Sequence, residues 1–389
     1  MTACEADWDE TWVLRTEDGR LEATVAAFGA TLVSLRVADA RGVLEDVLLG
    51  HSRDVAAVRA AVADPARAHP FFNCTVGRVC GRIGNGGRFV LDGTPVCVTA
   101  NEGGGAKMLH GGAHGFNTKL WRRSAARSVP GRVLCLETTS PDGDEGFPGT
   151  LHVAATFAVV AEPARAPTPA SPRAGPRAGP RAGLQITYEA RLDPAGAARA
   201  TVANLTNHFY VNLAPAATLG RGGITGHTLR LAAARYLPLD AQQLPVGVVA
   251  PVDTVMDFTA PRPVGARIRD VPGGVGYDHY YVLDEAEEEG AENDVDARRG
   301  AMRRAAVLHA PESGRTLTLY TTQPGLVLYT ANWIEGVRGK DGATYRNWDA
   351  LCMETQGYPD AVHWPAFPSI ALHKGEQLHH DTLLLFSSE

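Results

Sequence analysis

The stretch LQITYEARL, from Leu184 to Leu192, has an apolar side chain at every second position. The apolar residues are Leu184, Ile186, Tyr188, Ala190 and Leu192, and polar or charged residues stand between them. Successive side chains of a β-strand point to opposite faces of its sheet. The stretch therefore predicts a strand with one face in the protein core and the other nearer to solvent.

Similar short segments recur along the chain and set the expected fold class. Examples are LEATVAAFGATLVSLRV, LHVAATFAVV, TLTLYTT, YYVL and GLVLYTANW, separated by segments rich in glycine and proline. RFVLDGTPVCV places Asp92 and Gly93 between two β-prone runs, which predicts a hairpin with a two-residue turn. No long segment keeps a helical period with caps at both ends. The sequence predicts a mainly β protein, either a sandwich or a barrel.

Two segments interrupt the strand pattern and are expected to be loop insertions. Residues 161–183 contain three tandem Pro-Arg-Ala-Gly units, which offer almost nothing to bury. Residues 284–300 run from acidic to basic and predict another solvated loop. The first insertion lies between two strand-like runs, so we expect an extended hairpin loop within one domain covering residues 1–389.

Composition restricts the classes of partner. The 389 residues are 44% hydrophobic and 21% charged, as in globular proteins with a large core. The net charge of -6 argues against a nucleic-acid or membrane-surface partner, which would favour a basic face. The N-terminus lacks the basic start and apolar core of a signal peptide. We therefore expect a cytoplasmic protein, a monomer or weak dimer, that binds a small uncharged molecule.

The cysteines give no sign of a metal or disulfide framework. They are Cys4, Cys74, Cys80, Cys97, Cys135 and Cys352, with no CxxC pair and no regular spacing. Motifs of phosphate binding, zinc proteolysis and serine hydrolysis are also missing from the sequence, because Gly339-Lys340 precedes Asp341 and neither HExxH nor GxSxG occurs.

Five polar clusters at the ends of strand-like runs remain as candidate sites. Arg78 and Arg82 stand among glycines in NCTVGRVCGRIGNGGRF, as a surface pair or as a guanidinium fork for hydroxyls or carboxylates. His110, in MLHGGAHGF, precedes two glycines that allow a ligand close to the backbone. His208, in NLTNHFYVNLA, lies in an apolar and aromatic strand, where a buried imidazole must be hydrogen-bonded or functional.

The other two clusters carry carboxylates. Asp278, in GVGYDHYYVL, follows a glycine-rich turn, and Glu354, in METQGYPDAVHWP, follows an apolar run. Each also has an equally good structural explanation. Asp278 would cap the turn, and Glu354 would be held by neighbouring backbone amides. Their recurrence favours function, because paired acid and base groups among hydroxyl-binding side chains suit sugar chemistry.

These clusters, in this order, resemble the aldose 1-epimerases, also called galactose mutarotases. The resemblance rests on GRVCGRIGNGGRFVLDG, LHGGAHGFNTKLW, SPDGDEGFPG, NLTNHFYVNLA, GYDHYYVL, TTQPGLVLYTAN and METQGYPDAVHWPAFPSIALHKGEQ, and runs from about Leu21 to the C-terminus. It implies a large antiparallel β-sandwich, the galactose mutarotase-like supersandwich, with an open sugar cleft. It also implies an isomerase that needs no cofactor and no metal.

The resemblance assigns roles to the five candidates. It implies that Glu354 is the catalytic base and His208 the catalytic acid. Arg82, His110 and Asp278 fall at positions that bind the sugar. The expected substrates are free hexoses such as glucose and galactose, whose α and β anomers interconvert when the ring opens and closes.

The chain also departs from the family pattern. Gly81 stands where the family often has asparagine, and Val327 where it often has glutamine. Phe209 and Val211 replace a common serine and phenylalanine. Because the acid and the base are both present, we expect activity with an altered affinity or sugar preference.

Three alternatives remain open at this stage. One is an epimerase for hexose 6-phosphates, which needs a basic pocket. The second is a carbohydrate-binding protein without catalysis. The third is a metal enzyme built on His373, His379 and His380, whose spacing matches no ligand pattern.

Overall fold

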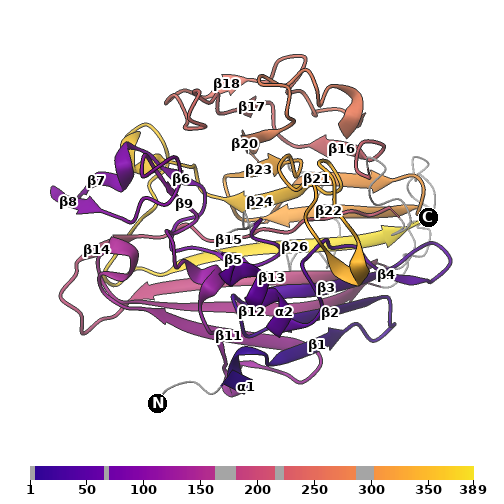
Figure 1. Ribbon diagram of the computed structural model, residues 1–389, viewed down its shortest axis with the longest axis horizontal. Helices are drawn as coiled ribbons and strands as arrows, with labels where there is room; N and C mark the ends of the chain where they lie inside the picture. Colours follow the sequence, from indigo (N-terminus) through magenta and orange to yellow (C-terminus); the bar gives the residue numbers. More distant parts are fainter. Residues whose placement is uncertain (1–4, 65–69, 163–180, 215–222, 286–301) are drawn as a thin grey trace, which may run out of the picture.

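The computed structural model describes residues 5–64, 70–162, 181–214, 223–285 and 302–389. Its main feature is a nine-stranded antiparallel sheet, whose long strands cross the molecule in Figure 1. In spatial order the strands are β10 (Arg122–Arg123), β11 (Val133–Ser140), β12 (Leu151–Glu162), β13 (Arg181–Leu192), β26 (Leu378–Ser388), β22 (Arg315–Thr321), β21 (Arg303–Ala310), β16 (Thr228–Leu231) and β19 (Arg262–Pro263).

Two further sheets have more than two strands among the described residues. A four-stranded sheet consists of β1 (Thr11–Arg15), β2 (Leu21–Ala26), β3 (Thr31–Ala38) and β4 (Leu44–Asp46). A five-stranded sheet has the order β18 (Ala250–Pro251), β17 (Arg235–Tyr236), β20 (Asp278–Val282), β23 (Gly325–Tyr329) and β24 (Cys352–Gln356). Figure 1 shows the five-stranded sheet on the opposite side of β26 from β1, β2 and β3.

Short elements connect the sheets. The paired strands are β5 (Thr75–Val76) with β15 (Thr206–Asn207), β6 (Arg82–Ile83) with β9 (Met108–Leu109), β7 (Arg88–Leu91) with β8 (Thr94–Cys97), and β14 (Ala200–Val202) with β25 (Ala371–His373). The described α-helices are α1 (Glu5–Trp8) and α2 (Val55–Ala63). In the described part of the chain, neither helix has the length and apolar character needed to cross a bilayer.

The strand that the alternating pattern predicts is β13. Its alternate residues Leu184, Ile186, Tyr188, Ala190 and Leu192 are all buried, and the residues between them are partly or fully exposed. They pack in the main hydrophobic core with side chains from β2, β3 and β11. The mainly β, antiparallel prediction is confirmed.

Two local predictions can be compared with the structure. In the predicted hairpin, Leu91 pairs with Thr94 across a turn in which Asp92 and Gly93 both have positive φ, at 48° and 79°. The pattern did not indicate α2, a nine-residue helix whose first turn is capped by the Asp54 side chain.

The first expected insertion is shorter than predicted. Strands β12 and β13 continue the ladder as far as the pairs Ala161↔Ala182 and Glu162↔Arg181, so residues 161–162 and 181–183 belong to strands. The rest of that segment, and the second one beyond Glu285, lie outside the described residues.

Candidate active site

The five-stranded sheet has one face in the core and one face at a pocket. Leu326 and Leu328 of β23 and Met353 of β24 join the main core. The alternate positions point the other way and line the pocket: Asp278 and Tyr280 of β20, Val327 and Tyr329 of β23, and Glu354 and Gln356 of β24. This alternation explains how Glu354 can follow an apolar run, because Met353 and Glu354 face opposite sides of the strand.

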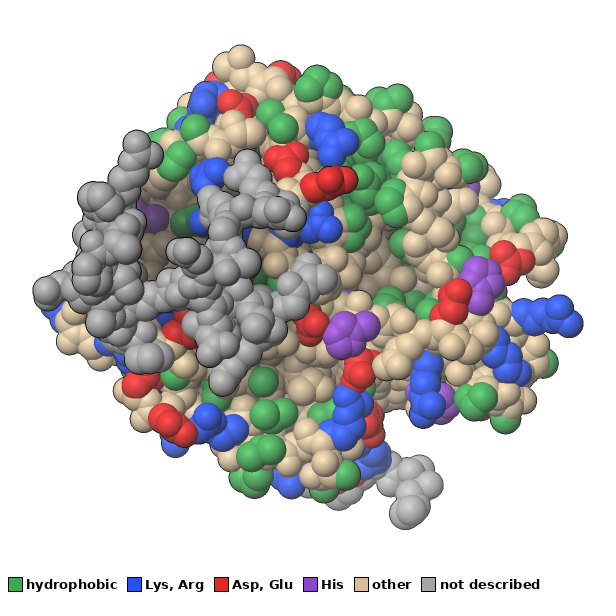
Figure 2. Space-filling view, turned by 180° about the vertical axis from the view of Figure 1, so that it is seen from behind, with side chains coloured by type: hydrophobic (Ala, Val, Ile, Leu, Met, Phe, Trp, Pro, Cys, Tyr) green, Lys and Arg blue, Asp and Glu red, His purple; other side chains and the backbone are tan. Residues whose placement is uncertain are grey.

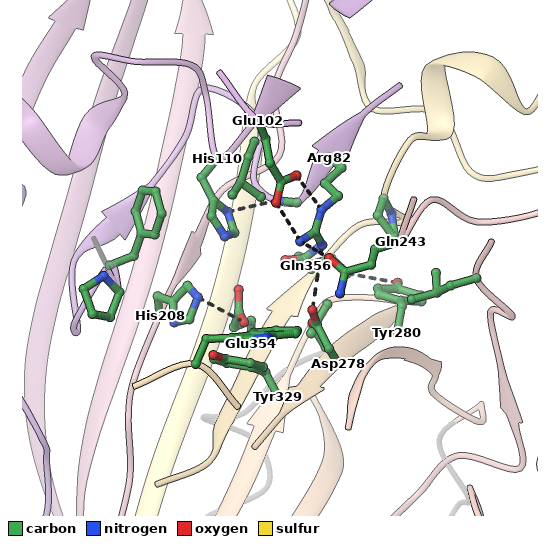
Figure 3. Close-up of a pocket in the computed structure, with 18 of the residues that line it drawn as sticks. Arg82, Glu102, His110, His208, Gln243, Asp278, Tyr280, Tyr329, Glu354 and Gln356 are labelled. Atoms are coloured by element: carbon green, nitrogen blue, oxygen red, sulfur yellow. Dashed lines mark hydrogen bonds and ion pairs between the residues drawn. The ribbon is translucent and has the colours of Figure 1, made fainter. Parts of the chain in front are cut away.

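Cross-strand register brings these side chains together. Val327 lies directly opposite Glu354 on one side and Tyr280 on the other, and Asp278 lies opposite Tyr329. Figure 3 shows the Glu354 carboxylate directed into the pocket between His208 and Asp278. The sheet therefore presents two carboxylates, Glu354 and Asp278, to the same cavity.

His208 enters the pocket from the segment that follows β15. Its imidazole stacks on Tyr210, with ring centroids 5.0 Å apart, and on Phe71 at 6.2 Å. His208 Nε2 lies 3.5 Å from Glu354 Oε1, and Figure 3 shows the two groups facing each other. The aromatic packing fixes the plane of the imidazole beside the carboxylate.

His110 lies above them, directly after β9, in a tight turn. Its φ is 53°, and a Cβ atom on Gly111 would lie 2.0 Å from the carbonyl oxygen of Gly77. The glycine is therefore needed for the close approach of these backbones. The Gly81 N–H donates to His110 Nδ1 at 3.2 Å. Because Nδ1 is an acceptor, the neutral ring carries its proton on Nε2.

Arg82, at the start of β6, is held by several acceptors. Its Nε and Nη2 atoms donate to the two carboxylate oxygens of Glu102 at 2.8 and 3.1 Å. Nη2 also donates to Gln243 Oε1 at 2.7 Å, and Nη1 lies 3.8 Å from Asp278 Oδ2. The paired, planar geometry fixes the guanidinium at the pocket wall.

Arg78 has a different environment from Arg82, and the surface-pair interpretation is wrong for it. Arg78 is buried at 2% exposure, and its guanidinium donates to the carbonyl oxygens of Ser140, Pro148 and Gly149. It does not line the pocket. Its role is to hold a distant loop.

The electrostatics of the pocket favour a basic carboxylate. Burial raises the pKa of Glu354 well above its usual value, the charge of Asp278 adds to this, and Arg82 opposes it. Burial also raises the pKa of Asp278, again against the effect of Arg82. A carboxylate whose pKa is raised is a stronger proton acceptor near neutral pH than an ordinary glutamate.

All five residues singled out by the resemblance, namely Arg82, His110, His208, Asp278 and Glu354, line this one pocket. The sequence analysis missed several other lining residues, including Glu102, Gln243, Trp333 and Gln356. Gln356 had a usable signal, because it stands two positions after Glu354 in a strand. Glu102 and Gln243 lie in loops without periodicity.

Three side chains in the pocket are also close enough together to act as ligands of one metal ion. The ligand atoms of His110, His208 and Glu354 all lie within 4.8 Å of one another. However, the hydrogen bond from Gly81 keeps the proton of His110 on Nε2, so the ring presents a donor to the pocket. A metal ion requires a lone pair at that position.

The histidines of the alternative metal site make separate contacts. His373 bonds to Asp92 and Glu376, and His379 bonds to Asp381. His380 is buried and bonds to Leu205 and Thr355, and burial lowers its pKa to about 4. Within the described residues, the three do not form a metal-binding cluster.

Comparisons with known proteins identify the class. The aldose 1-epimerase family model matches residues 11–163 and 180–385, and the chain belongs to this family of isomerases. It is 34% identical to the galactose mutarotase of Rattus norvegicus over 382 residues, which cover 97% of this chain and 94% of the relative. It is 33% identical to the human galactose mutarotase over 369 residues, or 94% and 91% of the two chains.

A more distant relative and two solved structures agree with this. The aldose 1-epimerase of Escherichia coli is 26% identical, covering 94% of this chain and 92% of that one. An aldose epimerase homologue from C. elegans has a TM-score of 0.76 at 23% identity, covering 97% and 99% of the two chains. Galactose 1-epimerase from Lactobacillus acidophilus has a TM-score of 0.67 at 21% identity, covering 98% and 99%. The predicted fold and family are thereby confirmed.

Proposed function

We propose that this aldose 1-epimerase family member interconverts the α and β anomers of free hexoses, with Glu354 as base and His208 as acid. The observation that carries the proposal is the 3.5 Å approach of His208 Nε2 to Glu354 Oε1 inside one pocket. The names of the relatives, galactose mutarotase and aldose 1-epimerase, support glucose and galactose as substrates.

The reaction needs one proton acceptor and one proton donor. Glu354 removes the proton from the C1 hydroxyl while protonated His208 gives a proton to the ring oxygen. The bond between C1 and the ring oxygen breaks, and an open-chain aldehyde forms. After rotation about the C1–C2 bond, the hydroxyl formed from the ring oxygen attacks the other face of C1, and His208 takes its proton back. Glu354 returns its proton to the former carbonyl oxygen, which becomes the C1 hydroxyl of the other anomer. Each positioned group typically contributes about 10²–10⁴-fold to the rate.

The remaining candidates hold the sugar during this sequence. Arg82 and His110 Nε2–H offer hydrogen-bond donors, and Asp278 offers an acceptor for a hydroxyl. Because Arg82 is already fixed by Glu102 and Gln243, it is oriented before the sugar binds. Held in this way, the open chain stays in position for ring closure.

The charge of the pocket favours free sugars over sugar phosphates. Among the described lining residues, Arg82 is the only Lys or Arg, whereas Glu102, Asp278 and Glu354 are acidic. Arg82 is already paired with Glu102. A phosphate dianion would meet more negative than positive charge, which disfavours binding.

The domain organisation, cellular location, oligomeric state and partners of the protein are also proposals. We propose that residues 1–389 form one domain and that the protein is a cytoplasmic monomer or weak dimer, without nucleic-acid or membrane partners. On the face shown in Figure 2, positive and negative side chains are interspersed, unlike the basic stripe typical of nucleic-acid binding.

Exchange spectroscopy by NMR tests the proposed activity. Purified protein should accelerate anomer exchange of glucose and galactose above the rate in buffer, and of the 6-phosphates much less. Faster exchange of the phosphates would favour the hexose 6-phosphate alternative. Sugar binding by calorimetry without any acceleration would favour a carbohydrate-binding protein.

A further inference from the structure

The backbone around Arg82 is held by the segment that follows β24. The Asp360 N–H donates to the Arg82 carbonyl oxygen at 3.1 Å, and the Gly84 N–H donates to Asp360 Oδ1 at 2.9 Å. Asp360 is 4% exposed and has a φ of 54°, in the left-handed region. Pro359, the residue before it, lines the pocket. Asp360 therefore fixes the backbone from which the Arg82 guanidinium reaches the pocket, where Figure 3 shows it.

His363, on the same segment, lies between two hydrogen-bond acceptors. It is the last residue of the short helix η9 (Ala361–His363). Its Nδ1 lies 2.6 Å from Asp360 Oδ1, and its Nε2 lies 2.8 Å from the carbonyl oxygen of Arg88, at the start of β7. A carbonyl oxygen and an ionised carboxylate can only accept hydrogen bonds, and a neutral imidazole has a single N–H. Only the protonated ring can therefore donate to both partners.

The groups that face the ring favour its protonated form. The hydrogen bond to Asp360 raises the pKa of His363, partial burial opposes this, and the Arg88 carbonyl oxygen and the charge of Asp360 add to the rise. Arg88 faces the ring with its main chain, whereas its guanidinium lies at Gly86, where an added Cβ atom would be 2.7 Å from Nη1. The net effect is a raised pKa, in agreement with the two-acceptor geometry.

We propose that His363 is a positioning residue, whose protonated ring holds both ends of the turn formed by residues 82–88 and so strengthens sugar binding by Arg82. This rests on the proposed function of the pocket. The ring holds Asp360, which in turn holds Arg82, and it also holds Arg88 at the far end of the turn.

Loss of the proton removes one of the two bonds of the ring. Because the pKa of His363 is raised in the folded protein, both bonds are present at lower pH and one is lost as pH rises through that raised value. Proton binding at His363 and sugar binding in the pocket then favour each other by the same factor.

Glucose dissociation constants of the unchanged protein and of His363→Phe, measured by calorimetry from pH 6 to pH 9.5, test the proposal. The ratio of the two constants removes the titration of the other pocket groups, which both proteins share. The variant should bind about fivefold more weakly at pH 6, at the lower end of the usual range for coupled sites, and the difference should shrink as pH rises. A ratio that stays constant with pH would reduce His363 to a packing residue and overturn the inference.

His363→Gln is the second test, and it applies even if the phenylalanine variant does not fold. Its amide keeps an N–H donor for one acceptor, as the neutral imidazole does, but takes up no proton. It should bind glucose more weakly than the unchanged protein at pH 6 and equally well at pH 9.5, with KM altered more than kcat. His373→Gln removes another histidine between two carboxylates, away from the pocket, and is the matched control that should bind normally.

The reciprocal effect is a change in the pKa of His363 itself. Its ring resonance, assigned by its absence from the spectrum of His363→Gln, should titrate above the usual value of about 6.5. Saturating glucose should raise this pKa further by about 0.7, which corresponds to the fivefold factor in affinity. An identical pKa with and without bound glucose would contradict the coupling.

The outcomes distinguish this inference from the proposed activity. Accelerated anomer exchange combined with a ratio of dissociation constants that does not depend on pH would overturn the role of His363 and leave the proposed function intact. Glucose binding with the expected pH dependence but without accelerated exchange would support the role of His363 and contradict the proposed catalytic function.

Discussion

His208 Nε2 lies 3.5 Å from Glu354 Oε1, and the two residues are 5% and 3% exposed. The pair is buried at the base of a pocket, while Tyr210 and Phe71 hold the imidazole plane. A sugar ring that contacts one group is within reach of the other. A buried carboxylate in this position has consequences for stability as well as for catalysis.

Glu354→Gln should stabilise the protein at neutral pH. The raised pKa of Glu354 means that the folded state holds this proton more tightly than the unfolded state, whose value is about 4.3. The contribution of this group to the free energy of unfolding is therefore fully present below about pH 4.3. It is lost as pH rises through the higher pKa of the folded state. We therefore expect the glutamine variant to have a higher free energy of unfolding than the unchanged protein at pH 8.

Urea unfolding of both proteins at pH 5 and pH 8 measures this gain. The advantage of the glutamine variant should be larger at pH 8. An unchanged or lower free energy of unfolding at pH 8 would show that burial does not penalise this carboxylate.

As pH decreases, kcat/KM should begin to fall at a higher pH than it would with an ordinary glutamate as the base. Glu354 must be ionised to act as a base, so kcat/KM declines as pH falls through its raised pKa. Asp278→Asn removes a neighbouring negative charge that contributes to the rise, and should move this acidic limb to lower pH. A limb near pH 4.3 in the unchanged protein would contradict the account.

Glu102→Gln should weaken substrate binding more than catalysis. The carboxylate fixes Arg82 through two hydrogen bonds, and the amide can accept only at one of these positions. We expect KM to rise by about tenfold and kcat to change little, because a partly buried charged bond is worth about 1.5–3 kcal/mol. Glu17→Gln, which breaks the exposed contact with Arg132, is the control and should leave KM unchanged.

Removal of metal ions should leave the activity unchanged. The Gly81 N–H bond to His110 Nδ1 keeps the His110 proton on Nε2, which opposes metal binding by His110, His208 and Glu354. Dialysis against EDTA and then against metal-free buffer, followed by anomer-exchange measurements, tests this. Loss of activity that added Zn²⁺ restores would contradict it.

Strand periodicity predicted the most regular parts of the fold from sequence. The alternation around Ile186 predicted the buried face of β13, and the Asp92-Gly93 turn predicted the hairpin. In these segments, local side-chain direction and turn conformation determine the outcome. The helix α2 is short, and its packing against Phe28 and Val33 was not visible in the local pattern.

The site was predictable where polar residues interrupt apolar strands, as at His208 and Glu354. The contacts of Glu102 and Gln243 with Arg82 depend on loops brought together across 20 and 161 residues, which no local pattern encodes. The same reason explains the error at Arg78, whose partners Ser140 and Gly149 lie 62 and 71 residues away.

The central claim is that Glu354 and His208 form the acid–base pair, and anomer exchange of glucose in Glu354→Gln and His208→Asn tests it most directly. Each variant should lose about 10²–10⁴-fold in rate while still binding glucose. Glu17→Gln and His373→Asn, at exposed positions, should retain the full rate. Full activity in either pocket variant would contradict the assignment.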